Sequence, residues 1–426
     1  MRRKDIVRKT FVVLALLALL LPLPATVAGA VGGPQASALP EEPSRSARRW
    51  VRNTLDDMSL EEKAAQLVAV RTFGYYENPR SEVHQNLLRQ VRDLGVGGVV
   101  VFASELETVP RLLNDLQEAA EIPLLVSADV ERGLAFRVRN GTVPLPWAMA
   151  IGASRSEEAA RFTGEVTARE ARALGIHWAL APVADVNNNP DNPVINIRSY
   201  GEDPDLVARM VRAYVEGTQA GGMLATAKHF PGHGDTSTDS HHVRPVVSAG
   251  RERLEAVELV PFRAAIDAGV DTIMTAHVVM TAVDAEAPAT LSKPVMTGLL
   301  REEMGFEGLI VTDALEMAGI RPAWTGEAAI RSLEAGADVL LLPRQPEVAI
   351  QSVVRAVAEG QLTEERIDRS VERVLMAKAR LGLHKERRVD DEALGGSVAR
   401  PQDMARALEI AQQSITVIRN EGDILP

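Results

Sequence analysis

The chain of 426 residues is 46% hydrophobic and 25% charged, which is ample for a large buried core. Its net charge of −11 argues against nucleic acid as a partner, and its aromatic content of 4% argues against extended stacking platforms for polysaccharide. It contains no cysteine, which excludes disulfides, thiolate nucleophiles and cysteine-ligated metals.

Residues 1–30 have the pattern of an export signal. Lys and Arg dominate the first nine residues, an unbroken apolar run covers 11–21, and Ala28-Gly29-Ala30 offers a small-x-small cleavage site. The apolar run is short for a membrane span, which favours cleavage over a retained anchor. We therefore expect a signal peptide, export to the periplasm, cell surface or medium, a linker at 31–45, and no membrane span in the mature chain.

Eight apolar runs, most of them continuous, alternate with helical patterns between residues 46 and 383. Parallel strands that are buried on both faces have such runs. They lie at 66–71, 97–102, 124–129, 177–185, 223–229, 272–278, 309–313 and 339–343. Eight βα units of this size predict an α/β fold with a TIM-type (β/α)8 barrel over 46–383. A doubly wound open sheet is the alternative, but no glycine-rich phosphate turn follows an early run.

Helical spacing is found at 47–58, 157–174, 204–220, 251–268, 347–359 and 364–381. Ser59-Leu-Glu-Glu is a capping box that opens one further helix. Residues 384–400 then have the composition of a linker, followed by a helical pattern at 403–413 and a strand-like segment at 414–419. We interpret 384–426 as a linker and the start of a second α/β domain, and we expect the native chain to continue past Pro426.

Polar residues follow five of the apolar runs. Because the carboxyl ends of barrel strands meet at one rim, these side chains should lie close together, as a catalytic site requires. The residues are Asp129, Asp185, Lys228 with His229, His277, and Thr312 with Asp313.

The segment 227–245, AKHFPGHGDTSTDSHHVRP, is a polar loop that follows the fifth run. It contains four of the eight histidines, together with Asp235 and Asp239. Gly232 and Gly234 allow backbone angles that other residues resist, so the segment is predicted to be a shaped loop. A zinc site is one alternative, but the histidine spacing matches no metal motif, so we expect neither a metal nor another cofactor.

At these motifs the sequence resembles family 3 glycoside hydrolases, specifically the bacterial β-N-acetylglucosaminidase branch. The match includes Lys228 to Gly234 (KHFPGHG) followed by Asp239-Ser240-His241, and Gly308 to Met317 (GLIVTDALEM). It also includes APVAD at 181–185, RSYG at 198–201, and the helix ending near 383. The resemblance covers roughly residues 50–426.

The resemblance implies a retaining exo-hydrolase that releases terminal β-linked N-acetylglucosamine from an oligosaccharide or glycoconjugate. It makes Asp313 the nucleophile and His241 the general acid/base, oriented by Asp239. The same resemblance implies that the terminal sugar is held by Asp129, Arg137, Asp185, Arg198, Lys228 and His229.

The chemistry of these residue types agrees with the implied roles. A retaining hydrolase needs a carboxylate nucleophile and a proton donor at the leaving oxygen. A positive rim of Arg198 and Lys228 should keep Asp313 ionised. A histidine near neutral pKa can both give and take a proton, and Asp239 can fix the tautomer of His241.

One motif departs from the family pattern. Where the family commonly has Asp-x-Glu-Gly-Gly-x-x-x-Arg, this chain has Arg132 in place of the first glycine, between Glu131 and Gly133. The shape of this loop and the preferred leaving group therefore stay open.

Two further alternatives also stay open from the sequence. A histidine donor suits phosphorolysis as well as hydrolysis, because a neutral imidazole repels phosphate less than a carboxylate does. A non-catalytic sugar-binding protein should have lost the nucleophile or the donor, and both are present. The natural substrate, whether a muropeptide, a chitin fragment or a glycoconjugate, is not specified by these motifs.

Overall fold

The computed structural model describes residues 39, 43–75, 77–240, 244–320, 325–390 and 394–422. The expected signal peptide and most of the linker at 31–45 lie outside these residues, as do His241 and His242. Within the described ranges, no helix is long and apolar enough to cross a membrane.

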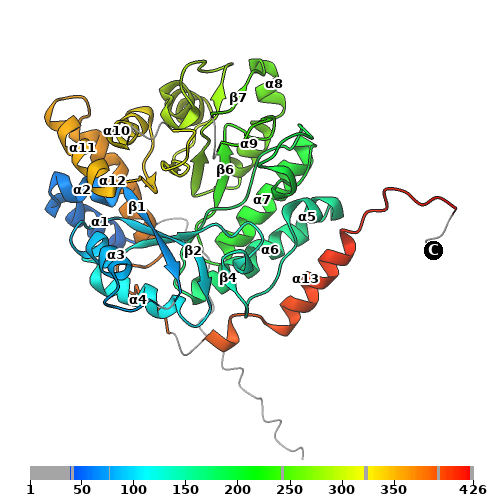
Figure 1. Cartoon of the computed structure of the whole chain (residues 1–426), viewed down its shortest axis with the longest axis horizontal. Helices are drawn as coiled ribbons and strands as arrows, with labels where there is room; N and C mark the ends of the chain where they lie inside the picture. The colour runs from blue at the N-terminus through cyan, green and yellow to red at the C-terminus, as the bar shows by residue number, and fades with distance from the viewer. Residues whose placement is uncertain are drawn as a thin grey trace, which may run out of the picture. The chain divides into compact units, whose positions relative to one another are not determined.

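Eight parallel strands form the centre of the fold (Figure 1). Hydrogen bonds order them as β11-β1-β2-β3-β5 and β10-β8-β6, and isolated bridges at Trp178–Leu224 and Val311–Val339 connect the two groups on both sides. The parallel sheet therefore curls into the ring of a (β/α)8 fold, at the eight positions that the apolar runs predict. The strands are β1 (Val68–Gly74), β2 (Gly98–Glu105), β3 (Leu125–Ala128), β5 (Trp178–Ala179), β6 (Thr226–Phe230), β8 (Thr272–Thr275), β10 (Leu309–Val311) and β11 (Leu340–Leu341).

Side chains fill the interior of this ring. Every residue of β3, β6, β8 and β10 is buried, so these strands lack the alternation of buried and exposed residues that a half-exposed sheet shows. The Trp178 indole N–H donates to Thr226 Oγ1 at 2.7 Å and to Thr272 Oγ1 at 3.0 Å. A buried indole needs such acceptors, so these contacts fix the relative positions of β5, β6 and β8.

Helices surround the strands on the outside (Figure 1). Ser59 and Glu62 form the predicted capping box of α2, with the Ser59 N–H donating to Glu62 Oε2 at 2.7 Å. The described helices are α1 (Arg45–Asp57), α2 (Leu60–Gln66), α3 (Glu82–Arg92), α4 (Val109–Ala119), α5 (Ala148–Ser154), α6 (Glu157–Ala173), α7 (Pro204–Ala220), α8 (Arg251–Ala256), α9 (Val260–Asp267), α10 (Thr325–Ala335), α11 (Pro346–Ala358), α12 (Glu364–Arg380), α13 (Pro401–Gln413) and the π-helix η4 (Pro294–Glu303).

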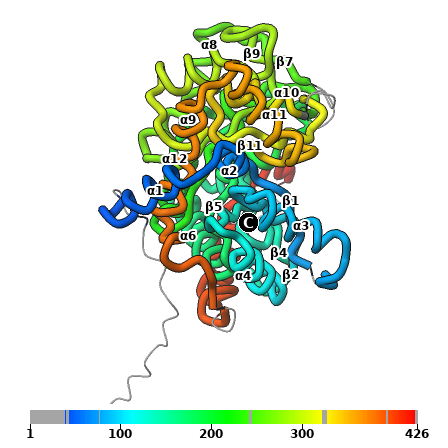
Figure 2. Tube along the Cα trace, turned by 90° about the vertical axis from the view of Figure 1, so that its left-hand side faces the viewer, coloured from blue at the N-terminus to red at the C-terminus, as the bar shows by residue number. Residues whose placement is uncertain are grey.

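Distant parts of the sequence meet where the ring closes. Strand β1 pairs with β11, and α1 and α2 pack beside α12 (Figure 2). The buried Lys63 ammonium on α2 contacts Glu364 at 2.9 Å and Asp368 at 2.8 Å on α12. The ring is therefore closed both by the pairing of β1 with β11 and by the ion pairs between α2 and α12.

Two predictions of local structure are wrong. The helical pattern at 251–268 is interrupted between α8 and α9, because Pro261 cannot continue a helix interior and instead lies in the first turn of α9. The strand expected at 414–419 is absent, and Ile415, Val417 and Ile418 are 76%, 59% and 96% exposed. A strand needs a neighbouring strand, and no described segment pairs with these residues.

Three short strands also lie outside the ring, β4 (Val138–Arg139), β7 (Val246–Val247) and β9 (Val279–Met280).

Helix α13 is attached to the barrel beside α5 (Figure 1). Ala407 and Ile410 are buried, and Arg169 on α6 pairs with Asp403. The fully buried Glu170 accepts hydrogen bonds from the Ala399 N–H at 2.8 Å and the Val143 N–H at 3.1 Å. Glu170 therefore connects the segment before α13 to the barrel.

We expect Glu170 to make the stability of the protein depend on pH. Burial raises its pKa from 4.5 to about 6, and the two N–H groups only partly oppose this. Between pH 4.5 and 6 the native protein holds a proton that the unfolded chain has lost, so the free energy of unfolding should fall as pH rises. Relative to Glu170→Gln, wild type should lose about 2 kcal/mol between pH 4 and pH 7.5 in urea unfolding. Parallel pH curves for the two proteins would contradict this assignment.

Candidate active site

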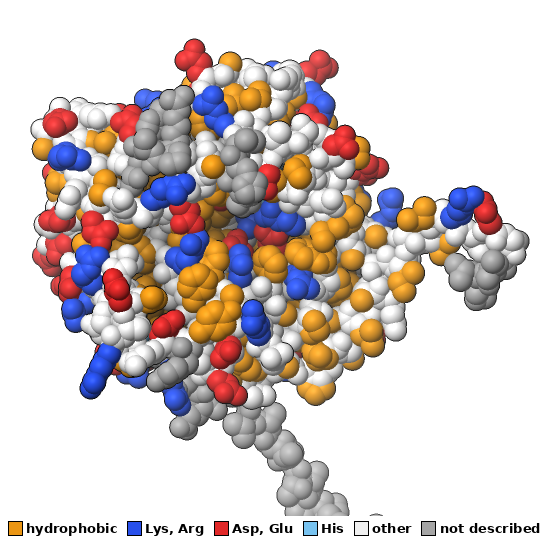
Figure 3. Space-filling view, in the orientation of Figure 1, with side chains coloured by type: hydrophobic (Ala, Val, Ile, Leu, Met, Phe, Trp, Pro, Cys, Tyr) orange, Lys and Arg blue, Asp and Glu red, His pale blue; other side chains and the backbone are white. Residues whose placement is uncertain are grey.

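A cavity of about 400 Å³ opens at the carboxyl ends of the barrel strands. All eight strands, or the segments that follow them, contribute side chains to it, with Val194 and Arg198 coming from the segment after β5. Figure 3 shows a hollow near the centre of one face, with basic and acidic side chains in it. Four Lys or Arg side chains and four carboxylates line the cavity, so its formal charge is balanced.

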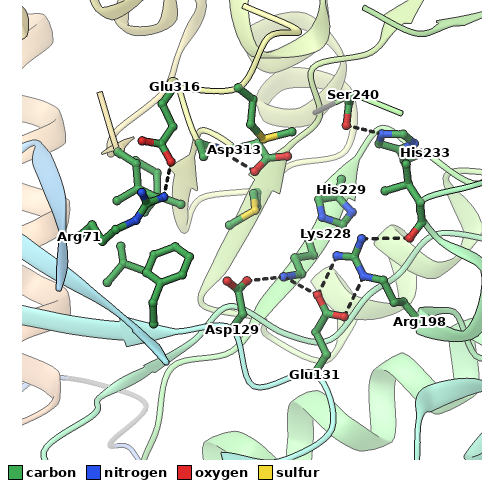
Figure 4. A pocket seen from close by; sticks show the side chains of 18 of the residues that line it. Arg71, Asp129, Glu131, Arg198, Lys228, His229, His233, Ser240, Asp313 and Glu316 are labelled. Carbon is green, nitrogen blue, oxygen red and sulfur yellow. Dashed lines mark hydrogen bonds and ion pairs between the residues drawn. The ribbon is translucent and has the colours of Figure 1, made fainter. Parts of the chain in front are cut away.

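An ionic cluster forms the floor of this cavity (Figure 4). Lys228 on β6 is 1% exposed, and its ammonium contacts Asp129 at 2.8 Å and Glu131 at 2.9 Å. Arg198 binds Glu131 through both nitrogens of its fork, at 2.7 and 2.9 Å, and Arg137 pairs with Asp129. Such paired charges tolerate burial because each loses water but gains a partner.

These contacts keep the cluster charged. Burial alone would raise the pKa of Glu131, but Lys228 and Arg198 hold it well below its ordinary range. The pKa of Asp129 is likewise lowered by Lys228 and Arg137 against the effect of burial. Burial would lower the pKa of Lys228, and the two carboxylates raise it. The carboxylates and the lysine of the floor are therefore ionised near neutral pH.

Asp313 faces the cavity from the loop after β10, opposite the ionic floor (Figure 4). Burial would raise its pKa, but His277 and His229, the Ala314 N–H at 2.7 Å and Lys228 together lower it. His277 itself is fully buried beneath this loop and bonds Thr290 and the Ala314 carbonyl. Asp313 is thus an anion that faces the cavity, as a nucleophile must be.

Asp185 lies behind the cavity wall and not in it. Its fully buried carboxylate contacts His229 Nδ1 at 2.7 Å and accepts the backbone N–H of His229 and of His233, the latter at 2.7 Å. The expectation that Asp185 holds a sugar directly is therefore not met by its position. It orients His229, which does line the cavity.

His233 connects this wall to the loop that leads to Asp239. Its Nδ1 contacts Thr236 Oγ1 and its Nε2 contacts Ser240 Oγ, both at 2.8 Å. Burial lowers the pKa of His233 to about 4, so the ring is neutral near pH 7. Ser240 lines the cavity, and its neighbour Asp239 is half-buried outside the lining, while His241 lies outside the described residues.

The structure brings most of the predicted site residues together. Asp129, Lys228, His229 and Asp313, which the strand ends predicted, line one cavity with Arg137 and Arg198, which the resemblance implied. Sequence analysis missed Arg71, Phe102, Phe136 and Glu316, which line it too. Arg71 is the polar residue at the end of the apolar run 66–71. The criterion that identified Asp129, a polar residue at a strand end, could therefore have identified Arg71 too.

The departure at Arg132 does not strain the loop. Gly133 has φ +78°, and a Cβ there would lie 2.6 Å from Leu145 Cδ1, so position 133 requires glycine. Arg132 has no such positive φ, and its side chain lies over the rings of Trp147 and Phe136. Arg132 is therefore accommodated in this loop without a left-handed backbone conformation.

Residues 59–377 match the model of the glycosyl hydrolase family 3 N-terminal domain, and they include the whole ionic floor and Asp313. The chain belongs to glycosyl hydrolase family 3. The cavity at the carboxyl ends of its strands is therefore the candidate active site of a family 3 glycosyl hydrolase.

Similar proteins and structures extend this result. The chain is 35% identical over 388 residues to a β-N-acetylglucosaminidase/β-glucosidase of Cellulomonas fimi, covering 88% of this chain and 67% of the relative. A family 3 β-N-acetylglucosaminidase of Paenibacillus sp. FPU-7 superposes with a TM-score of 0.80 at 41% identity, covering 86% of this chain and 70% of the other. A β-glucoside phosphorylase superposes with a TM-score of 0.83 at 31% identity, covering 92% and 71%. The chain thus spans about two thirds of each relative's length.

His233→Phe should loosen the loop at 235–240 of this family 3 glycosyl hydrolase. Phenylalanine keeps an aromatic ring of somewhat larger size at this position but loses both contacts, to Thr236 and to Ser240. Backbone amides of 235–240 should exchange with deuterium at least several-fold faster, while those of β6 should not change. Ser240→Ala removes one of the two contacts and should give a smaller effect. Unchanged exchange in His233→Phe would show that the loop is held by other contacts.

Proposed function

We propose that this protein is a retaining exo-β-N-acetylglucosaminidase. Its active site releases terminal β-linked N-acetylglucosamine from an oligosaccharide or glycoconjugate. The proposal is supported by the named relatives, and above all by Asp313, a carboxylate kept ionised at the cavity opposite a charged floor. In a retaining reaction this group attacks the anomeric carbon and forms a covalent glycosyl intermediate.

The ionic floor suits the binding of a sugar's hydroxyl groups. Asp129 and Glu131 accept hydrogen bonds, Lys228, Arg137 and Arg198 donate them, and none needs to change its protonation state. His229, fixed by Asp185, adds a further polar group beside them. Charge-assisted hydrogen bonds of this kind position the anomeric carbon above Asp313.

For the proton donor we propose His241, with Asp239 as its orienting partner. Both belong to the loop that His233 and Ser240 connect to the cavity wall. In the first step the imidazolium protonates the leaving oxygen, and in the second the imidazole takes a proton from the attacking water. The carboxylate of Asp239 would stabilise the imidazolium, as in hydrolase triads.

Asp313→Ala should lower kcat on 4-nitrophenyl N-acetyl-β-glucosaminide by several orders of magnitude without unfolding the protein, because no covalent intermediate can form. In wild type, a 5-fluoro N-acetylglucosaminyl fluoride should label Asp313, which peptide mapping detects. The neighbouring Glu316, paired with Arg71, serves as the internal control. A label on Glu316 or Asp185 would overturn the assignment of the nucleophile.

His241→Ala should lose far more activity on substrates with poor leaving groups than on activated aryl glycosides. Protonation by a general acid accelerates the departure of a sugar alcohol about 10²–10⁴-fold, whereas a dinitrophenolate leaves without being protonated. Activated substrates should show a burst, because water attack on the intermediate then lacks its base. Asp239→Asn should behave the same way more mildly, and adding it to His241→Ala should cost little more. If His241→Ala loses activity equally on both substrate classes and shows no burst, the proton donor is a residue other than His241.

Phosphorolysis is the alternative, since a β-glucoside phosphorylase has the same fold at 31% identity. The two reactions differ in the acceptor that opens the glycosyl intermediate. Product analysis with and without phosphate distinguishes them, because hydrolysis gives free N-acetylglucosamine in both cases and phosphorolysis gives the sugar 1-phosphate. Parallel assays on the β-glucoside test the sugar preference.

Export by residues 1–30 and a second α/β domain after 384 stay predictions. In the described part after 394, residues form the helix α13, a short 3₁₀ turn and no strand.

A further inference from the structure

One buried asparagine shapes the loop that carries Arg198. Asn192 is 2% exposed and lies in the segment of residues 186–198, after β5, which we call the asparagine segment. Its Oδ1 accepts the backbone N–H of Val194 at 2.9 Å and that of Ile195 at 2.8 Å. The Val194 carbonyl in turn accepts from Arg198 Nη1 at 3.2 Å. Because Val194 and Arg198 both line the active-site cavity, the Asn192 amide lies directly behind its wall.

The other end of the same amide binds a second loop, residues 233–240. We call it the donor loop, because it leads to the proposed proton donor. Asn192 Nδ2 donates to the carbonyl of His233 at 2.8 Å and to that of Gly234 at 2.9 Å. With two bonds in each loop, the amide uses both lone pairs of its oxygen and both hydrogens of its nitrogen.

The two loops are in close contact around Asn192. A Cβ at Gly234 would lie 1.7 Å from the Val186 carbonyl oxygen, so the two backbones touch at this position. The next carbonyl of the donor loop, that of Asp235, accepts from Asn189 Nδ2 at 3.3 Å. At such close packing, a displacement of one backbone requires a displacement of the other.

The outer ends of both loops reach the cavity. In the asparagine segment, Arg198 is bound by Glu131 of the ionic floor. In the donor loop, His233 Nε2 contacts Ser240 Oγ at 2.8 Å, and Ser240 lines the cavity (Figure 4). A contiguous series of contacts therefore joins the floor to the donor loop through Asn192.

We propose that Asn192 is a positioning residue that couples the sugar-binding floor to the donor loop. A sugar bound at the floor fixes Arg198 and the asparagine segment, and Asn192 then holds the start of the donor loop in the position from which Asp239 and His241 serve the leaving oxygen. The inference rests on the proposed function, since it describes how the same site is regulated. Proton transfer depends on occupation of the sugar site, although Asn192 never touches the sugar.

Hydrogen exchange measures this coupling without any reaction. In wild type, saturating N-acetylglucosamine should slow the exchange of donor-loop amides about threefold or more. In Asn192→Asp this protection should be lost, because the carboxylate keeps the acceptor for Val194 and Ile195 but turns an oxygen toward the two carbonyls. Asn187→Asp is the matched control in the same segment. Asn187 Oδ1 accepts the Asn196 N–H at 3.1 Å, which aspartate also accepts, so the protection should remain. Calorimetry gives the sugar concentration that saturates each protein.

Steady-state kinetics separate proton transfer from general damage to the fold. The ratio kcat/KM reports the first chemical step, in which only a poor leaving group needs the proton. Asn192→Asp should lower kcat/KM about 10–100-fold on N,N′-diacetylchitobiose and less than about threefold on the 3,4-dinitrophenyl N-acetyl-β-glucosaminide. Azide should raise kcat on the dinitrophenyl substrate, because azide opens the glycosyl intermediate without a base. A partly unfolded variant would instead lose kcat/KM equally on both substrates and would not respond to azide.

Asn192→Ser is a second change at the same position. A serine hydroxyl can keep the local turn but is too short to bind both carbonyls, so the same two effects are expected. Thermal melting of each variant confirms that it is folded, and Asn187→Asp should match wild type in both measurements.

The outcomes distinguish this inference from the proposed function. Retained protection of the donor loop in the Asn192 variants, or an equal loss of kcat/KM on the two substrates, refutes the role of Asn192. The proposed function still stands if wild type cleaves 4-nitrophenyl N-acetyl-β-glucosaminide. If wild type cleaves no N-acetylglucosaminide, the proposed function fails. The same proteins are then compared with glucose and the corresponding glucosides, on which the coupling predicts the same differences.

Discussion

The active site depends on one buried lysine. The Lys228 ammonium has almost no contact with water, and it would be expensive to bury without Asp129 and Glu131. Those carboxylates come from the loop after β3, and Glu131 in turn fixes Arg198 from the loop before α7. One charged contact on β6 therefore fixes two loops that are distant in sequence. The loss of Lys228 would remove one of the two cationic partners of Asp129 and one of the two of Glu131.

A second network, built on hydrogen bonds, begins at Asp185. It passes through His229, at the cavity, and through His233, whose ring contacts Thr236 and Ser240. The first network holds fixed charges, and the second reaches the loop where we propose the proton is exchanged. This division suits a retaining reaction, because the ion pairs of the floor hold the sugar with fixed charges while the donor has to change its protonation state twice.

The eight strands could be predicted because strands buried on both faces leave long apolar runs, and polar residues at their ends marked the rim. The role of Asp185 could not be predicted in this way, since a carboxylate at a strand end can face the cavity or lie behind it. The contacts of Arg71 and Arg137 with the rings of Phe102 and Phe136 join β1, β2 and the loop after β3, and only the folded ring shows that these residues touch. The break at Pro261 and the missing strand at 414–419 show that periodicity alone does not account for proline or for an absent pairing partner.

The pairing of β1 with β11 has a consequence for synthesis on the ribosome. The first strand exposes one edge until the eighth, some 270 residues later, has emerged, since no earlier strand pairs with that edge. Helix α12, which neutralises the buried Lys63, emerges later still. A nascent chain thus keeps an open sheet edge and an unpaired lysine until the barrel is almost complete, and the active site is completed only near the end of the barrel.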